Sequence, residues 1–120
     1  MKKISDILMP LYNKYLPECE ERKISLNLDL PDPTIPVDDP KELEKTLKKL
    51  IKDATKRIGK KGSITIGARK GIKYAIVLAV KDTGPALTSE ERENLEAENT
   101  EVRSRMGYGT TITIKIPPHS

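Results

Sequence analysis

The chain has 120 residues, of which 36% are hydrophobic and 33% charged, with a net charge of +4. This length predicts one domain and is too short for two ordinary ones. Its single cysteine, Cys19, excludes an intramolecular disulfide, and its single histidine, His119, next to the last residue, disfavours Ser/His/Asp, Cys/His and poly-histidine chemistry. No apolar run reaches the ~18 residues that a membrane span requires, so we expect a cytoplasmic protein without a membrane segment.

The first predicted elements are a helix and a strand. Residues 4–22 place apolar side chains at helical spacing, and we expect Pro10 and Pro17 to kink or divide this helix. Residues 23–30 alternate between apolar and polar side chains, which predicts a half-buried strand. The proline-rich stretch that follows allows only turn and extended backbone, with a short edge strand over residues 35–37.

The strongest helix is predicted to begin at Pro40. Asp39 is a good N-cap residue, Pro40 suits the first helical position, and Glu42 completes a capping-box spacing. Either Gly59 or Gly62 can end this helix. One of its faces is rich in lysine, and the other carries an apolar stripe of Leu43, Leu47, Leu50, Ile51, Ala54 and Ile58.

A hairpin is predicted next. Residues 63–69 and 72–81 read as two strands joined by a tight turn at Lys70-Gly71. The second strand has apolar side chains on both of its faces, which predicts that it lies in the centre of its sheet.

The last predicted elements are a short helix and two strands. Thr88 or Ser89 caps an acidic helix that runs to about Ala97. Residues 110–117 alternate as a strand, and residues 100–104 are expected to pair with it. The order of elements predicts an α+β fold, a two-layer sandwich with a mixed, mostly antiparallel sheet and helices on one face.

Asp82 is the first candidate for chemistry, because it ends the predicted central strand and Gly84 follows it in a turn. An acid in this position can accept a hydrogen bond from the exocyclic amine of a ligand, and the glycine lets a flat ring approach the backbone. The alternative is a strand-to-helix turn in which both residues satisfy only local geometry.

Several segments together resemble one known family. The stretch Val80-Lys-Asp-Thr-Gly-Pro-Ala resembles the first glycine box, D-x-G-x-G-I, of the GHKL or Bergerat-fold ATPases, and specifically of sensor histidine kinase catalytic domains. Residues 47–56 resemble the N-box, N-L-x-x-N-A-x-K, and residues 100–117 resemble the closing hairpin. The resemblance covers residues 4–117 and implies a Bergerat-like fold, a place in a two-component system, and ATP or ADP bound with magnesium.

The resemblance also assigns the residues of an adenine site. It places Asp82, Gly84 and Thr110 around the base, although a threonine in a terminal strand is equally explained by its β propensity. Ala86 stands at the second glycine of the box, where its methyl group would crowd the base pocket.

The resemblance assigns two further residues to the phosphates. Lys56 matches the N-box lysine, and Asp53 stands where the family has the asparagine that helps hold magnesium. A carboxylate can ligate magnesium, but it adds negative charge beside a polyphosphate. The alternative for Asp53 is a surface ion pair with Lys49, Lys56 or Arg57 at helical spacing.

The chain departs from the family between the first glycine box and the closing hairpin. The family has an F-box, a lid, a second glycine box and a further helix there, whereas this chain has only residues 88–99. No glycine-rich segment precedes a helix in that interval, so the donors that would hold the outer phosphates are missing. No histidine lies in residues 1–118 to accept a phosphoryl group. We therefore expect no catalytic residue and no autonomous turnover; any histidine-kinase-type phosphotransfer would act on an acceptor in trans.

The leading interpretation is that residues 1–120 form a single histidine-kinase-like ATP-binding domain without the lid. It would be a degenerate or minimised module, natural or engineered, that binds ATP or ADP weakly or not at all. The alternative is a scaffold or protein-interaction domain without any ligand. Loss of the lid and a helix would also leave apolar sheet surface uncovered, which favours a homodimer.

A third interpretation is nucleic-acid binding through the lysine-rich helix. Eight basic residues fall within the 17 positions from Lys45 to Lys61. However, no aromatic residue is interleaved with them to stack on bases, which disfavours this interpretation.

Overall fold

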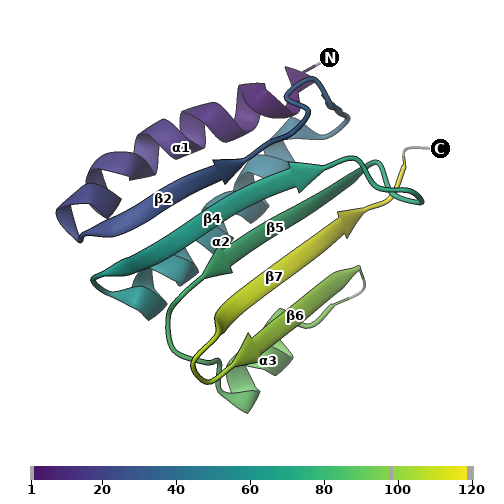
Figure 1. The fold of residues 1–120 in the computed structure, drawn as a ribbon. Coiled ribbons are helices and arrows are strands. Elements are labelled where there is room, and N and C mark those ends of the chain that lie inside the picture. Colours follow the sequence, from purple (N-terminus) through teal and green to yellow (C-terminus); the bar gives the residue numbers. More distant parts are fainter. Residues whose placement is uncertain (1, 98, 119–120) are drawn as a thin grey trace.

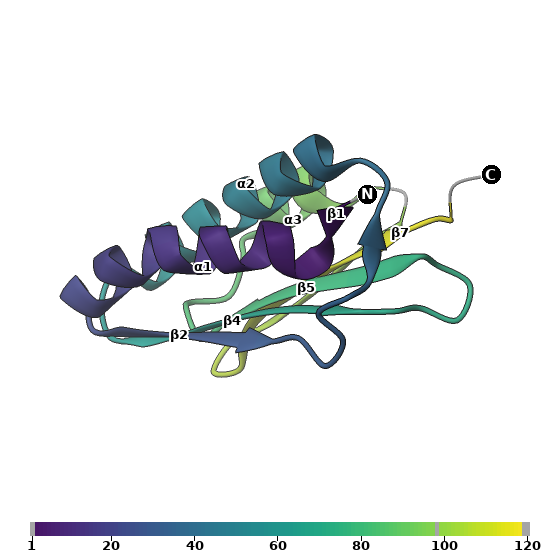
Figure 2. The ribbon, with the colours of Figure 1, turned by 90° about the horizontal axis from the view of Figure 1, so that it is seen from above.

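The computed structural model of the protein describes residues 2–97 and 99–118, and therefore not His119. The chain forms a five-stranded sheet with helices on one face (Figures 1 and 2), which confirms the predicted α+β sandwich. The elements are β1 (Lys2–Lys3), α1 (Ile4–Glu21), β2 (Ile24–Asp29), β3 (Pro36–Val37), α2 (Pro40–Ile58), β4 (Gly62–Arg69), β5 (Ile76–Asp82), α3 (Ser89–Leu95), β6 (Thr100–Arg105) and β7 (Gly109–Ile116).

The sheet has the strand order β2-β4-β5-β7-β6. β2 and β4 run parallel, and the other three neighbouring pairs are antiparallel, so the sheet is mixed and mostly antiparallel, as predicted. The crossover between the two parallel strands contains α2, which thereby comes to lie on the sheet. β5 occupies the centre of the sheet, as predicted from its apolar side chains on both faces.

A separate two-stranded ladder joins β1 to β3. Lys2 pairs with Val37 in antiparallel register, which ties the start of α1 to the segment before α2. The predicted short strand near residues 35–37 therefore forms, but it lies outside the five-stranded sheet.

The connection between β4 and β5 is longer than predicted. Residues 70–75 form it, so the expectation of a tight turn at Lys70-Gly71 with a strand beginning at Ile72 was wrong. The register places Ala68 opposite Leu78 with both side chains buried, and this pairing leaves the intervening residues to close the hairpin as a loop. Ile72 is fully exposed in that loop, although its position in the sequence resembles that of a strand residue.

α1 is one continuous helix despite its two prolines. Pro10 and Pro17 are both exposed, and they do not divide the helix as expected. Each removes a single backbone donor on the side away from the sheet, while the opposite side is held by core contacts. The buried side chains of α1 are Ile4, Ile7, Leu8, Leu11, Tyr15 and Cys19.

α2 begins and ends as predicted. The Asp39 side chain accepts a hydrogen bond from the backbone N–H of Glu42 at 3.3 Å, and Pro40 is the first helical residue. Gly59 follows the last turn with φ +71°, a backbone conformation that favours glycine.

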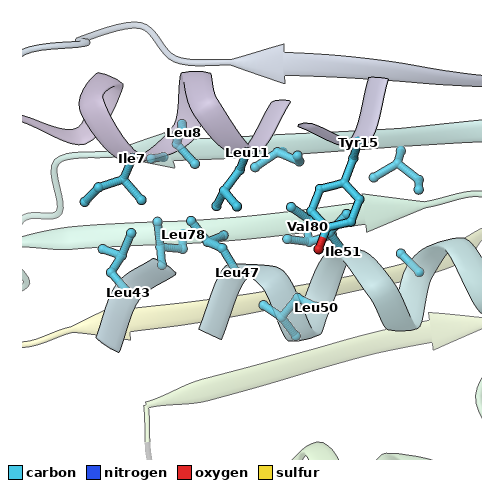
Figure 3. Close-up of a cluster of buried hydrophobic side chains, with 14 of the residues drawn as sticks. Ile7, Leu8, Leu11, Tyr15, Leu43, Leu47, Leu50, Ile51, Leu78 and Val80 are labelled. Carbon is cyan, nitrogen blue, oxygen red and sulfur yellow. The ribbon is translucent and has the colours of Figure 1, made fainter. Parts of the chain in front are cut away.

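The hydrophobic core lies between the two long helices, α1 and α2, and the sheet. In Figure 3, Leu11 and Tyr15 of α1 point toward Leu47 and Ile51 of α2, over Val80 of β5. Burial raises the pKa of the Tyr15 hydroxyl, which has no hydrogen-bond partner among the residues that the structure describes. This packing fixes the C-terminal half of α2 over the end of β5.

The sheet face opposite the helices is mostly polar, with Val77 and Ala79 of β5 as apolar exceptions. Figure 1 views this face, and the register of β4, β5 and β7 places Thr65, Lys81 and Thr111 side by side on it. The uncovered apolar sheet surface expected from the missing lid therefore does not lie here. Within the described ranges, no helix has the combination of length and apolar character needed to cross a membrane.

α3 is a short helix held mainly by its cap. Thr88 accepts from the backbone N–H of Glu91 at 3.1 Å, and the Glu91 carboxylate accepts from the backbone N–H of Thr88 at 3.0 Å. The bond from that backbone N–H is the main reason why the pKa of Glu91 is lowered. None of the α3 residues is buried, so little packing supports the helix.

Thr88→Ala should therefore open α3 selectively. We expect a loss of about 1 kcal/mol, seen as roughly fivefold faster amide hydrogen exchange in α3 with little change in β5. Ser89→Ala is the control, because Ser89 follows the cap; equal acceleration in both variants would contradict the role of the cap. The Glu91 contribution should be present above the ordinary glutamate pKa and be lost as pH falls through its lowered value.

Candidate functional site

Asp82 is fully buried at the end of β5, and both of its carboxylate oxygens have partners. Oδ1 accepts from the backbone N–H of Gly84 at 2.9 Å, and Oδ2 accepts from Nη2 of Arg57 at 2.6 Å. The first bond is the local turn that the alternative interpretation described, and the second is an ion pair with the last turn of α2. The side chain is thus closed to solvent with both oxygens bonded inside the protein, so a ligand amine does not reach this carboxylate in this arrangement.

Arg57 is itself almost buried. Its side chain is 10% exposed, and its Nε is buried without a partner among the described residues. An unpaired buried donor costs about 1–3 kcal/mol, so the contact with Asp82 is maintained against a penalty. Arginine suits such a position better than lysine, because its guanidinium is less strongly hydrated.

Arg57 was not predicted to belong to this site. Its position in the sequence places it in the basic segment of the helix and among the possible ion-pair partners of Asp53. A signal was present, because a carboxylate at the end of a central strand needs a cation or several donors, and Arg57 is the single arginine of α2. The ion pair to Asp82 replaces the expected one to Asp53, which has no ion-pair partner in the part of the chain that the structure describes.

Gly84 packs against protein backbone. A Cβ at this position would lie 3.2 Å from the backbone nitrogen of Ile58 and 3.1 Å from Oδ1 of Asp82. The sequence predicted that the flat ring of a ligand would approach the backbone at Gly84. In the structure, the end of α2 makes this close approach instead. Ala86, two residues further on, is half-buried in the loop before α3.

Thr110 is buried directly opposite Asp82 in the pairing of β5 with β7. Its hydroxyl lies 2.8 Å from the hydroxyl of Ser104, which in turn accepts from the backbone N–H of Leu87 at 2.8 Å. Thr110 is thus close to Asp82, as the resemblance implies, but its hydroxyl joins β6 and the loop before α3.

Lys56 and Asp53 line a different space, which we call the α2–α3 cavity. It has a volume of about 260 Å³ and is lined by Lys49, Asp53, Lys56, Arg57, Leu87, Glu91, Asn94 and Leu95. Five of the six residues predicted for the site therefore fall into two groups, Asp82 with Gly84 and Thr110, and Asp53 with Lys56, while Ala86 belongs to neither. Arg57 contacts both groups, because it bonds to Asp82 and lines the cavity.

The charges around the α2–α3 cavity nearly cancel. Lys49 and Lys56 face the carboxylates of Asp53 and Glu91, and the charge of Arg57 is already neutralised by Asp82. A phosphate would gain two cations but also meet two anions. In the described ranges, no group of three or more His, Cys, Asp or Glu side chains could hold a metal ion. Asp53 and Glu91 are the two carboxylates of the lining, and one carboxylate oxygen of Glu91 already accepts from the backbone N–H of Thr88.

The lysine-rich face of α2 forms a second, shallow hollow of about 530 Å³, which adjoins the α2–α3 cavity because Lys49, Asp53 and Lys56 line both. Its lining is Lys41, Glu44, Lys45, Lys48, Lys49, Lys52, Asp53 and Lys56. This lining contains no aromatic side chain, so the structure adds no stacking platform for nucleic acid.

Comparisons with known proteins bear on the fold. No protein-family model matches the chain. Over 116 residues it is 23% identical to the adaptive-response sensory kinase SasA of Synechococcus sp. (strain JA-3-3Ab). The matched region covers 92% of this chain and 30% of that protein. The chain thus spans under a third of the length of this curated relative.

Two solved structures illustrate the structural likeness. The catalytic domain of histidine kinase ThkA superposes with a TM-score of 0.81 at 15% identity, over 98% of this chain and 96% of that one. Histidine kinase ThkA in complex with response regulator protein TrrA matches with a TM-score of 0.74 at 16% identity, over 98% of this chain and 41% of that chain.

Proposed function

We propose that this chain, which has the fold of a histidine kinase catalytic domain, is a minimised adenine nucleotide-binding module of low affinity without kinase turnover. The observation that carries this proposal is the α2–α3 cavity, which combines Lys49, Lys56 and the edge of Arg57 with the apolar side chains of Leu87 and Leu95. Cations beside apolar surface are what a nucleotide needs for its phosphates and its base.

Low affinity follows from the charges and from the closed state of Asp82. The lysines of the α2–α3 cavity are offset by Asp53 and Glu91, and Arg57 occupies the carboxylate that would accept from the adenine amine. Absence of turnover follows from the interval between β5 and β6, where Gly84 is the one glycine and α3 has seven residues. Phosphoryl transfer depends on donors arranged around the transferred group, and this interval offers no glycine-rich loop to supply them.

A titration with ADP and magnesium, followed by backbone amide shifts, tests this proposal. We expect saturable shifts in α2 and α3 with a Kd of about 1 mM, which corresponds to about −4 kcal/mol. Lys56→Ala should weaken binding roughly fivefold, because Lys56 lines the α2–α3 cavity. Lys52→Ala is the control on the same helix, since Lys52 lies outside that cavity. Unchanged spectra at several millimolar ADP would refute the proposal.

The Arg57–Asp82 pair favours a second candidate, a protein-interaction domain without a nucleotide. An ion pair that closes the base site is compatible with a fold retained as a docking surface. The match to ThkA bound to a response regulator supports a protein as the partner class. Two results together would favour this candidate over the nucleotide and nucleic-acid alternatives. The amide spectra of the folded protein would not change when ADP is added, and the protein would bind duplex DNA only weakly at every salt concentration.

A further inference from the structure

An apolar groove runs along α2 on the helix-covered side of the sheet. Two hollows of about 470 and 370 Å³ share Glu42, Thr46 and Ile114 in their linings and are therefore continuous. The second hollow also shares Lys49, Asn94 and Leu95 with the α2–α3 cavity, so the two surfaces adjoin at that end. We call this surface the helix-face groove. Its floor is formed mainly by Leu78, Ile114 and Ile116, and α2 forms one of its walls.

The helix-face groove exists because the helix layer is incomplete. α2 packs on β4 and β5, whereas the seven-residue α3 packs on β6, and β7 lies between them. The register places Ile112, Ile114 and Ile116 of β7 on the side of the helices. Ile112 is buried, but Ile114 and Ile116 are only partly buried. These two side chains face the helix layer, as core residues do, but no helix in the described part of the chain covers them completely. In Figure 2, α1 and α2 lie side by side over one part of the sheet, and β7 extends beyond them.

A helix is the element that fits this space. In a two-layer fold, the position beside a helix and above a sheet is normally filled by another helix. A second copy of the chain is a poor occupant, because two concave surfaces do not pack against each other. The apolar sides of α1 and α2 are already buried in the core, and α3 has no apolar side to offer.

We propose that the helix-face groove binds an amphipathic helix of a partner protein, antiparallel to α2. The charges along the groove set the direction. Asp38, Asp39 and Glu42 lie at the end near the start of α2, and Lys45 and Lys49 lie further along it. Helices are stabilised by acidic residues at their N-terminus and basic residues at their C-terminus. Such a helix meets opposite charges at both ends only when it runs antiparallel to α2.

A synthetic peptide of about 15 residues tests this proposal. The peptide has leucines at helical spacing on one side, glutamates in its first turn, lysines in its last turn, and blocked termini. We expect saturable binding, with amide shifts concentrated at Thr46, Leu50 and Ile114, which line the helix-face groove. A peptide of the same length with glutamine in place of its glutamates and lysines should bind at least about tenfold more weakly, because its ends no longer meet opposite charges.

Two variants locate the binding site. Thr46→Lys and Ile114→Lys each place a charge in the helix-face groove, and each should abolish binding of the peptide. Thr46 lies on α2, so its variant keeps the sheet intact if Ile114→Lys fails to fold. Thr113→Lys is the matched control on the opposite face of β7. Binding that survives both groove variants, equal affinity for the two peptides, no binding of either, or sedimentation showing a dimer that Thr46→Lys dissociates would each overturn the proposal.

Discussion

Asp82→Ala is expected to lower the free energy of unfolding by about 3–5 kcal/mol, because it leaves the guanidinium of Arg57 buried without its counter-ion. The Asp82 side chain is fully buried and Arg57 is 10% exposed, so water replaces the lost partner poorly. Urea denaturation monitored by circular dichroism measures the change.

The exposed ion pair between Arg69 and Asp29 provides the control. Its atoms lie 3.2 Å apart, but the two side chains are 66% and 51% exposed. Asp29→Ala should therefore cost less than about 1 kcal/mol. A loss of the same size at Asp29 and Asp82 would show that burial of the second pair does not determine its contribution.

A double-mutant cycle separates the pair from its surroundings. We expect Arg57→Met combined with Asp82→Ala to be less destabilising than the sum of the two single changes, by about 0.5–3 kcal/mol. Strict additivity would mean that the two residues act independently. The cycle also matters for function, since any nucleotide measurement on an Asp82 variant is informative only when that variant is shown to be folded.

Gly109→Ala should be about as damaging as the loss of Asp82. Gly109 begins β7 with φ +80°, and a Cβ there would overlap the carbonyl oxygen of Asp82 and lie 3.0 Å from the Cα of Thr83. Backbone strain of about 1–3 kcal/mol and steric overlap of about 1–3 kcal/mol add to an expected loss of about 2–6 kcal/mol. The midpoint of urea unfolding reports this loss.

Gly107→Ala isolates the contribution of the backbone. Gly107 has φ +86°, but a Cβ there would meet nothing within 4 Å. Its replacement should cost only about 1–2 kcal/mol, the penalty of the left-handed conformation for an L-residue. If the two glycine variants unfold at the same urea concentration, the close approach of β7 to the end of β5 is not the cause.

The resemblance of the chain to histidine kinase catalytic domains was visible in the sequence, and the structural likeness bears it out. The fold brings only some of the residues that the resemblance assigned to the site close to one another. Thr110 lies opposite Asp82, Lys56 and Asp53 share a cavity, and Arg57 contacts both groups. Arg57 and Asp82 are 25 positions apart, so no local pattern could pair them.

Alternation, helical spacing and capping are properties of a few consecutive residues, and they were sufficient to predict α2 with its caps, the central place of β5 and the two-layer α+β fold. The length of the loop at residues 70–75 depended on the register between β4 and β5, and the continuity of α1 through Pro10 and Pro17 depended on its packing against the sheet. The state of Asp82 depended on where the end of α2 lies in space. Each of these outcomes is decided by contacts between distant segments, and such contacts exist only once the chain has folded.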